Sequence, residues 1–253
     1  MIRMRSRVWI VALLVLFVAV PDVYAHRPEP GNQEGVTRIP DPVTSYAYYR
    51  EIVSPDQVHV YEFQARAGQF FHAGINIPQL EGLQDFGVTF ALLGPGLPPI
   101  EEQALHSHNS DEDLGPDDVK EDGANSLTAV LVSTGLSDEL KSGATGVVVV
   151  ESVTGADFFE PFTQTRYWGR QELDLNLPEG GTYRLLIWNP HGKTGKYVLD
   201  TGTEEVFGVE DLLRFPLWWL NARVYFEQTP QLIGASAVLF AAALGLVVYR
   251  LRQ

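Results

Sequence analysis

The sequence predicts a mostly β protein: an antiparallel β-sandwich or jelly roll, followed by a juxtamembrane helix and one C-terminal transmembrane helix. Three observations predict it. Apolar and polar residues alternate over many short segments, turn-forming residues separate these segments, and a long apolar run stands near the C-terminus. The chain contains no cysteine, so we expect packing alone to stabilise the exported domain.

The alternation is clearest at residues 173–177, where every second residue is a leucine and the residues between are polar. Such a period puts one face of a strand on a core and the other toward water. The spacing of the segments is typical of a β-sandwich. We predict short strands at residues 58–65, 71–77, 88–92, 127–131, 147–149, 173–177, 183–187 and 197–199.

Two segments near the end of the domain carry the residues of tight turns. Residues 178–181 and residues 190–195 each contain one proline and two glycines. Because each separates two predicted strands by a few residues, we expect both to be hairpin loops.

The N-terminal 25 residues predict a secretory signal peptide. Arginines precede an apolar run at residues 8–20, and the small residues Val23 and Ala25 precede the expected cleavage site. An uncleaved N-terminal anchor is the alternative. After cleavage, residues 26–45 should form an extended lead-in rich in Pro and Gly, and residues 46–208 the ectodomain.

The C-terminal segment at residues 231–249 predicts a transmembrane helix. Its uncharged run would extend about 27 Å as a helix, which is close to the hydrocarbon thickness of a bilayer. Arg250 and Arg252 follow, and a basic tail favours the cytoplasmic side. The sequence therefore predicts a single-pass membrane protein with residues 250–253 inside the cell and its domain outside; a buried core helix is the alternative.

Residues 209–230 predict a helix next to that span, with a kink or break at Pro216. Trp218 and Trp219 lie just outside the span, and indole rings favour the membrane interface. We expect either a helix at the bilayer surface or, as the alternative, a helix packed on the sandwich.

The net charge of the chain excludes some classes of binding partner. The chain has a net charge of −14, and the arginines at its two ends lie outside the exported part. This argues against binding to nucleic acid or broadly to anionic lipid. Residues 100–125 predict a long acidic loop with few apolar groups to anchor it.

Two stretches resemble a known architecture. Residues 60–69 (VYEFQARAGQ) resemble the opening strand and turn of the bacterial pre-peptidase C-terminal (PPC-like) β-sandwich, and residues 181–199 resemble its closing hairpin. The resemblance implies an accessory binding module of exported proteins, often hydrolases, although no hydrolase domain accompanies it here. The whole chain also resembles exported, membrane-anchored bacterial and archaeal proteins, which implies no particular activity.

Histidines suggest a copper site. Cleavage after Ala25 would give His26 a free α-amino group beside its imidazole, and a second histidine would complete a histidine brace for Cu(II). Five other histidines could supply that second ligand, with His72, His106 and His108 as the candidates we single out and His59 and His191 as the others. The alternative is that cleavage leaves a histidine at this position by chance.

A calcium site is a second metal hypothesis. Asn109, Asp111 and Asp113 have the alternate spacing of a calcium loop, but Leu114 and Lys120 stand where an EF-hand requires Gly and Glu. Loose Ca²⁺ binding or a merely solvated acidic loop are the remaining interpretations.

Three aromatic residues suggest a glycan site. Tyr167, Trp168 and Trp188 could form an exposed platform for sugar rings, or could belong to the core. No Gly-x-Ser-x-Gly, His-Glu-x-x-His or phosphate-loop motif is present. We therefore expect a non-enzymatic module that binds a partner protein or a glycan, with copper binding and calcium binding as alternatives.

Overall fold

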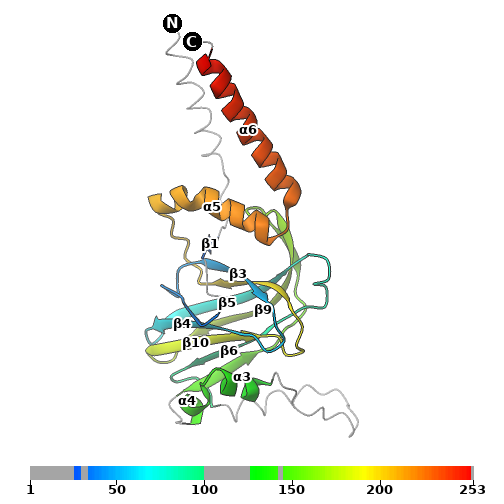
Figure 1. Cartoon of the computed structure of the whole chain (residues 1–253). Helices are drawn as coiled ribbons and strands as arrows, with labels where there is room; N and C mark the ends of the chain where they lie inside the picture. Colours follow the sequence, from blue (N-terminus) through cyan, green and yellow to red (C-terminus); the bar gives the residue numbers. More distant parts are fainter. Residues whose placement is uncertain (1–25, 30–33, 100–125, 142–144, 252–253) are drawn as a thin grey trace.

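The computed structural model describes residues 26–29, 34–99, 126–141 and 145–251. Two β-sheets pack face to face, and helices cover parts of both outer surfaces (Figure 1). The predicted signal peptide and the predicted acidic loop, with His106, His108 and the candidate calcium residues, lie outside the described residues.

The sheets are mixed rather than purely antiparallel. β1 runs parallel to β3, and β2 runs parallel to β4, while the other pairings are antiparallel. Both parallel strands lie in the segment expected to have little regular structure, and they are too short for alternation to reveal. The six-stranded sheet has the order β1 (Arg27–Pro28), β3 (Tyr46–Ile52), β11 (Gly195–Thr201), β5 (Phe70–Pro78), β9 (Thr165–Asn176), β8 (Asp157–Glu160). The five-stranded sheet has the order β2 (Val36–Arg38), β4 (Val58–Ala65), β10 (Gly181–Trp188), β6 (Thr89–Gly94), β7 (Gly146–Val150).

The main core lies between the two sheets and consists of every second residue of their strands. Phe63 of β4 stacks on Phe71 of β5, with 4.5 Å between ring centroids, and thereby joins the sheets. Leu185 and Ile187 of β10 are fully buried in the same layer. The structure thus confirms the prediction, made from the alternation of apolar and polar residues, of which strand residues face the core.

The two predicted hairpin loops are connections between sheets. β10 lies in the five-stranded sheet, whereas β9 before it and β11 after it lie in the six-stranded sheet. Residues 178–181 and 190–195 therefore carry the chain across the sandwich, and the hairpin prediction is wrong. Turn residues show where a chain reverses, but the sheet that accepts the next strand depends on distant partners.

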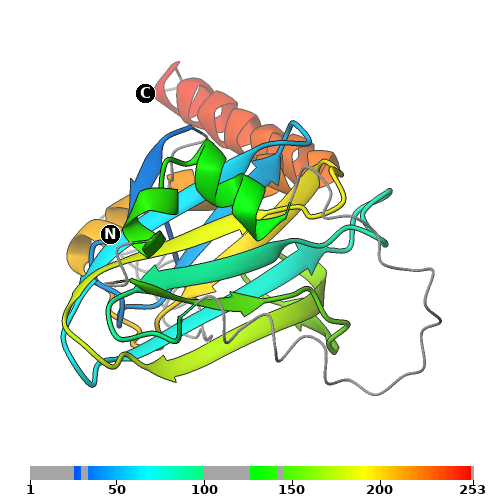
Figure 2. The same cartoon turned by 90° about the horizontal axis from the view of Figure 1, so that it is seen from below.

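One predicted strand, at residues 127–131, is a helix. Ser126 caps it by accepting a hydrogen bond from the Ala129 backbone N–H at 3.3 Å. Val130 and Leu131 are buried against the outer face of the five-stranded sheet. A short apolar run can form either a strand or a helix, and here the N-terminal cap and the packing on the sheet favour the helix. The two helices of this layer, seen in green in Figure 2, are α3 (Leu127–Ser133) and α4 (Ser137–Lys141).

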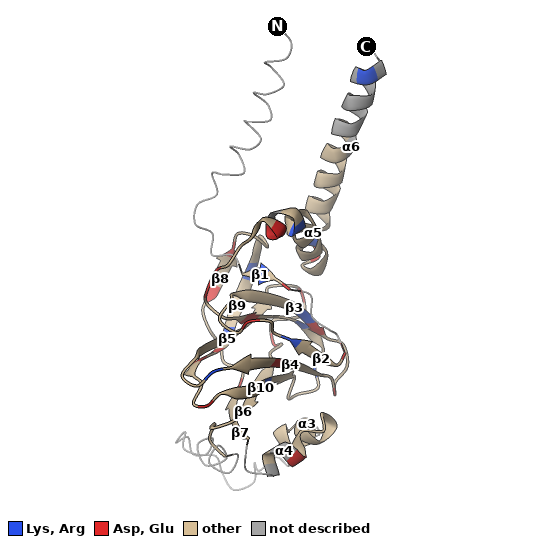
Figure 3. Ribbon diagram, turned by 90° about the vertical axis from the view of Figure 1, so that its left-hand side faces the viewer, with Lys and Arg blue, Asp and Glu red and all other residues tan. Residues whose placement is uncertain are grey.

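Two longer helices end the chain: α5 (Val209–Tyr225) and α6 (Thr229–Leu251). α5 lies across the outer face of the six-stranded sheet, and α6 leads away from the sandwich (Figures 1 and 3). Among the residues that the structure describes, no helix combines the length and the apolar character needed to cross a membrane. The side chains of residues 240 and 242–249 lie outside that description, and the span at 231–249 stays a prediction.

Candidate functional site

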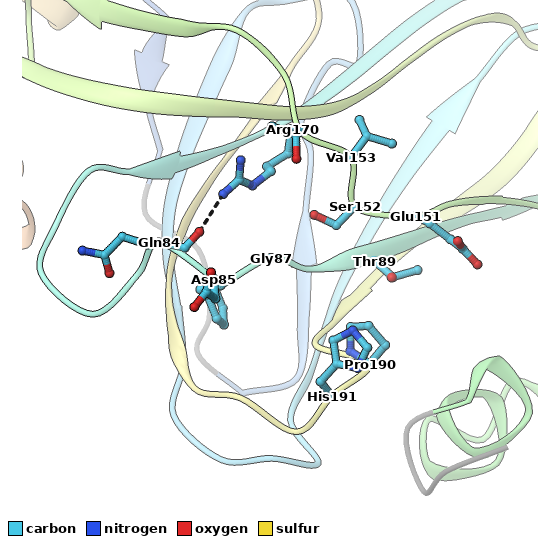
Figure 4. Close-up of a pocket in the computed structure, with 12 residues that line it drawn as sticks. Gln84, Asp85, Gly87, Thr89, Glu151, Ser152, Val153, Arg170, Pro190 and His191 are labelled. Atoms are coloured by element: carbon cyan, nitrogen blue, oxygen red, sulfur yellow. Dashed lines mark hydrogen bonds between the residues drawn. The ribbon is translucent and has the colours of Figure 1, made fainter. Parts of the chain in front are cut away.

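A cleft of about 490 Å³ opens where several loops meet at one end of the sandwich (Figure 4). The connections after β5, β7 and β10 supply Asp85, Glu151 and His191, and β9 supplies Arg170. Acidic, basic and hydroxyl-bearing side chains therefore converge on one concave surface. Loops held by a rigid sandwich are common positions for binding residues.

A β-bulge places Arg170 in this cleft. The β5–β9 register shifts between Gly74 and Asn76, so Arg170 and Gln171 together stand opposite one residue of β5. The Arg170 guanidinium donates to the Gln84 carbonyl oxygen at 3.3 Å (Figure 4). It also lies 5.8 Å from the Trp168 ring centroid. Burial lowers the pKa of Arg170, and the nearby Asp157 opposes that shift. Bulges re-aim side chains and concentrate next to functional sites.

A second cleft, of about 470 Å³, meets the first at the bulge. Asn76, Phe158 and Glu172 contribute to its lining, and it shares Val153 and Arg170 with the first cleft. Arg170 thus stands at the junction of the two clefts and contributes to the lining of both.

A polar network reaches the second cleft from the outer face of the six-stranded sheet. His72 is hydrogen-bonded through Nδ1 to Asp174 (2.7 Å) and through Nε2 to Asp200 (3.1 Å), and Asn76 donates to Asp200 at 2.6 Å. Gly74 leaves the space for Asp200, because a Cβ there would lie 2.5 Å from a carboxylate oxygen. The hydrogen bond to Asp200, helped by Asp174, raises the pKa of His72 to about 9. His72 is therefore a protonated donor at neutral pH, and neither ring nitrogen is free for a metal.

The structure separates the predicted copper ligands. His26 precedes β1, with its Nδ1 2.5 Å from the Ser45 hydroxyl, whereas His72 belongs to β5. Three strand spacings separate β1 from β5, or roughly 14 Å. Each ring also has partners of its own, Ser45 for His26 and the two aspartates for His72. Among the described residues, no group of three or more His, Asp or Glu side chains is arranged to hold a metal.

The predicted aromatic platform is divided among three surfaces. Tyr167 is covered by α5, with its ring 5.8 Å from that of Phe226. Trp188 is buried beneath α3 on the opposite side of the sandwich, and the half-buried Trp168 packs against the main core. The three rings do not share an exposed face, because α5 lies over Tyr167 and α3 over Trp188.

The predicted interfacial helix packs on the sandwich. Trp218 and Ala222 of α5, and Phe226 directly after it, are buried on this side. The fully buried Arg223 donates to the carbonyl oxygens of Phe162 and Thr163. We call this contact the Arg223 clamp.

The remaining predicted interface residues lie elsewhere. The Trp219 ring lies 5.0 Å from the Arg223 guanidinium. Arg250 is at the far end of α6, and Arg252 lies outside the described residues. The two tryptophans are therefore engaged with the protein, and leucines and valines make up most of the exposed apolar surface of α5.

Sequence reasoning missed Arg170, Gln171 and Arg223. A signal for the first two exists, because residues 169–171 interrupt the alternation before the regular stretch at 173–177. Arg223 carries no such signal: an arginine on a helix is ordinarily solvated, and only the packing of α5 buries it.

No protein-family model matches the chain, and no curated protein sequence matches it. Among solved structures, PliG of Salmonella Typhimurium, a periplasmic inhibitor of g-type lysozyme, is 16% identical, with 68% of this chain and 100% of that chain covered and a TM-score of 0.30. The pre-peptidase C-terminal domain of a Bacillus anthracis collagenase is 11% identical (66% and 95% covered, TM-score 0.30). CorA, a surface-associated copper-binding protein of Methylomicrobium album BG8, is 8% identical (70% and 100% covered, TM-score 0.30). Likeness at this level carries no functional argument.

Proposed function

We propose that this chain is a non-catalytic binding module outside the cytoplasm, and that it binds a partner protein at the two clefts joined by Arg170. The bulge that places Arg170 at the junction of the two clefts carries the proposal. Its guanidinium is held by the Gln84 carbonyl and the Trp168 ring but makes no ion pair among the described residues. It therefore retains donors for a carboxylate or carbonyl oxygen.

The chemistry of the first cleft favours a protein over a glycan. Asp85, Glu151 and Arg170 offer both signs of charge, which complement charged side chains and peptide groups. An uncharged sugar gains from stacking on an exposed ring, but Phe86, the aromatic residue among those lining this cleft, is 3% exposed. The partner we propose is accordingly a polar protein segment.

The proposed attachment to a membrane rests on the sequence of residues 231–249. This run carries no charge, and Arg250 follows it directly. We expect the full chain to stay with membranes during alkaline carbonate extraction and a chain ending at residue 230 to be released. Release of the full chain under the same treatment would refute the anchor.

The binding site can be tested by crosslinking in cells that express the protein. A photoreactive amino acid at Ser152, on the rim of the first cleft, should yield a defined protein adduct. Arg170→Ala should weaken that adduct strongly, because the central donor is lost. The same photoreactive residue at Val132, exposed on α3, is the matched control.

Identical adducts from both positions would point to chance collisions. An adduct at Ser152 whose yield is unchanged by Arg170→Ala would show that the partner does not contact Arg170. Either outcome contradicts the proposed site.

A further inference from the structure

The helix α5 has a second apolar face that the sandwich does not cover. Five aliphatic residues follow one another at spacings of three and four and are 45–80% exposed. Helical geometry puts such a series on a single face. We call this surface the outer stripe; it consists of Val209, Leu213, Leu217, Leu220 and Val224.

The outer stripe lies opposite the face that contacts the sandwich. At 3.6 residues per turn, Leu220 points about half a turn away from Asp211, Trp218 and Ala222, which are buried. A helix at the surface of a soluble domain normally presents polar residues there. The polar residues Glu210, Arg214 and Asn221 instead form a flank beside the stripe.

The helix cannot turn to hide the outer stripe. The Arg223 clamp fixes one side of α5 to the β8–β9 connection. The Tyr225 hydroxyl contacts the carbonyl oxygens of Arg50 and Tyr197 at 2.5 and 2.8 Å, and Lys196 donates to Tyr225 O at 2.9 Å. The sandwich therefore holds the stripe outward as a fixed surface.

The exposed apolar surface continues into α6. This helix begins shortly after α5 ends and exposes Ile233, Val238 and Leu239. It leaves the end of α5 on the side away from the sandwich (Figure 1), so both apolar surfaces lie on that side. Val206 and Phe207, just before α5, are also half-exposed.

The chemistry of this surface fits lipid. The outer stripe extends over roughly 22 Å of helix and contains no hydrogen-bonding side chain. Protein interfaces combine apolar centres with hydrogen bonds, whereas the acyl boundary of a bilayer accepts a purely aliphatic face with polar residues at its flank. The acidic chain fits a zwitterionic surface better than an anionic one.

We infer that the outer stripe of α5 lies on the surface of a lipid bilayer, which makes the six-stranded sheet membrane-proximal and the α3–α4 layer membrane-distal. This inference rests on the proposed placement of the chain at a membrane. It assigns the lipid contact to the aliphatic face of α5 rather than to Trp218 and Trp219.

The absence of cysteine makes a direct test possible. Leu217→Cys in the outer stripe and Val132→Cys on α3 are matched variants, because both positions are aliphatic, helical and well exposed. Each variant of the full chain, carrying a nitroxide on the cysteine, is reconstituted into phosphatidylcholine vesicles. Collision rates are then measured with oxygen, which concentrates in lipid, and with a water-soluble nickel chelate.

We expect the label at residue 217 to collide often with oxygen and rarely with nickel, and the label at residue 132 to show the reverse. Equal nickel collisions at both positions would place the stripe in water and overturn the inference. Protection of residue 217 from both reagents would place it against protein, as a second copy or another partner, and would overturn it too.

Co-sedimentation with the vesicles tests the membrane placement of the chain separately from the lipid contact of the outer stripe. A chain that does not co-sediment contradicts the membrane placement itself. A chain that co-sediments while residue 217 stays open to nickel contradicts only the assignment of the outer stripe.

Discussion

At the scale of single residues, two histidines occupy opposite electrostatic surroundings. His59 is buried, with its Nδ1 2.7 Å from the Tyr197 hydroxyl, and burial together with the charge of Arg50 lowers its pKa to about 4. His72 lies between Asp174 and Asp200, and its hydrogen bond to Asp200 contributes most to raising its pKa to about 9. His59 is thus neutral and His72 charged at neutral pH.

These histidines predict a stability maximum near pH 6.5. The unfolded chain protonates His59 below its ordinary pKa of 6.5 while the folded chain resists, so stability falls as the pH drops toward 4. The raised pKa of His72 contributes stability that is fully present below 6.5 and is lost as the pH rises through about 9. Each effect is worth at most about 3 kcal/mol.

Denaturant unfolding across this pH range checks the prediction. His72→Gln should flatten the alkaline side of the profile only, and His59→Asn the acid side only. If either variant shifts the whole curve without changing its slope, the assigned histidine does not titrate as described.

At the scale of elements, a buried guanidinium is one of the contacts that attach α5 to the sandwich. Arg223→Ala would leave the Phe162 carbonyl oxygen without its donor, and the Thr163 carbonyl oxygen with the Gln228 amide in place of the guanidinium. We expect a loss of about 3 kcal/mol in the free energy of unfolding, together with faster amide exchange along α5.

The exposed Arg214 on the same helix is the matched control, since its replacement by alanine should change stability by no more than about 0.5 kcal/mol. Similar losses for Arg223→Ala and Arg214→Ala would show that the clamp does not hold the helix. A stability loss without faster exchange in α5 would place the effect in the β8–β9 connection instead.

At the scale of the whole molecule, a net charge of −14 is spread over a chain with few ion pairs among its described residues. Repulsion between exposed carboxylates then outweighs the attraction of surface pairs, each worth about 1 kcal/mol or less. Added NaCl up to about 0.15 M should therefore raise the melting temperature, because it screens the repulsion.

A thermal melt in NaCl, compared with one in a neutral osmolyte of equal osmolality, checks this expectation. Glu172→Gln combined with Asp85→Asn, both exposed, should reduce the gain from salt. A melting temperature that falls with NaCl would mean that attractive pairs dominate the folded state.

The sequence by itself determined the β-rich class, the face of most strands and several strand bounds. β4 spans the predicted residues 58–65, because the alternation of apolar and polar side chains is a local property of a strand. The same locality explains the positions of α5 and α6, whose apolar patterns are continuous along the chain.

Only the tertiary structure decided which sheet each strand joins, that residues 127–131 form a helix, and that Tyr167 and Trp188 are covered. It also decided the bulge at Arg170, the burial of Arg223 and the outer stripe of α5. These features depend on contacts such as that between His72 and Asp200, which are 128 positions apart. A local pattern shows which side of an element is apolar, but the layer that covers that side comes from residues elsewhere in the chain.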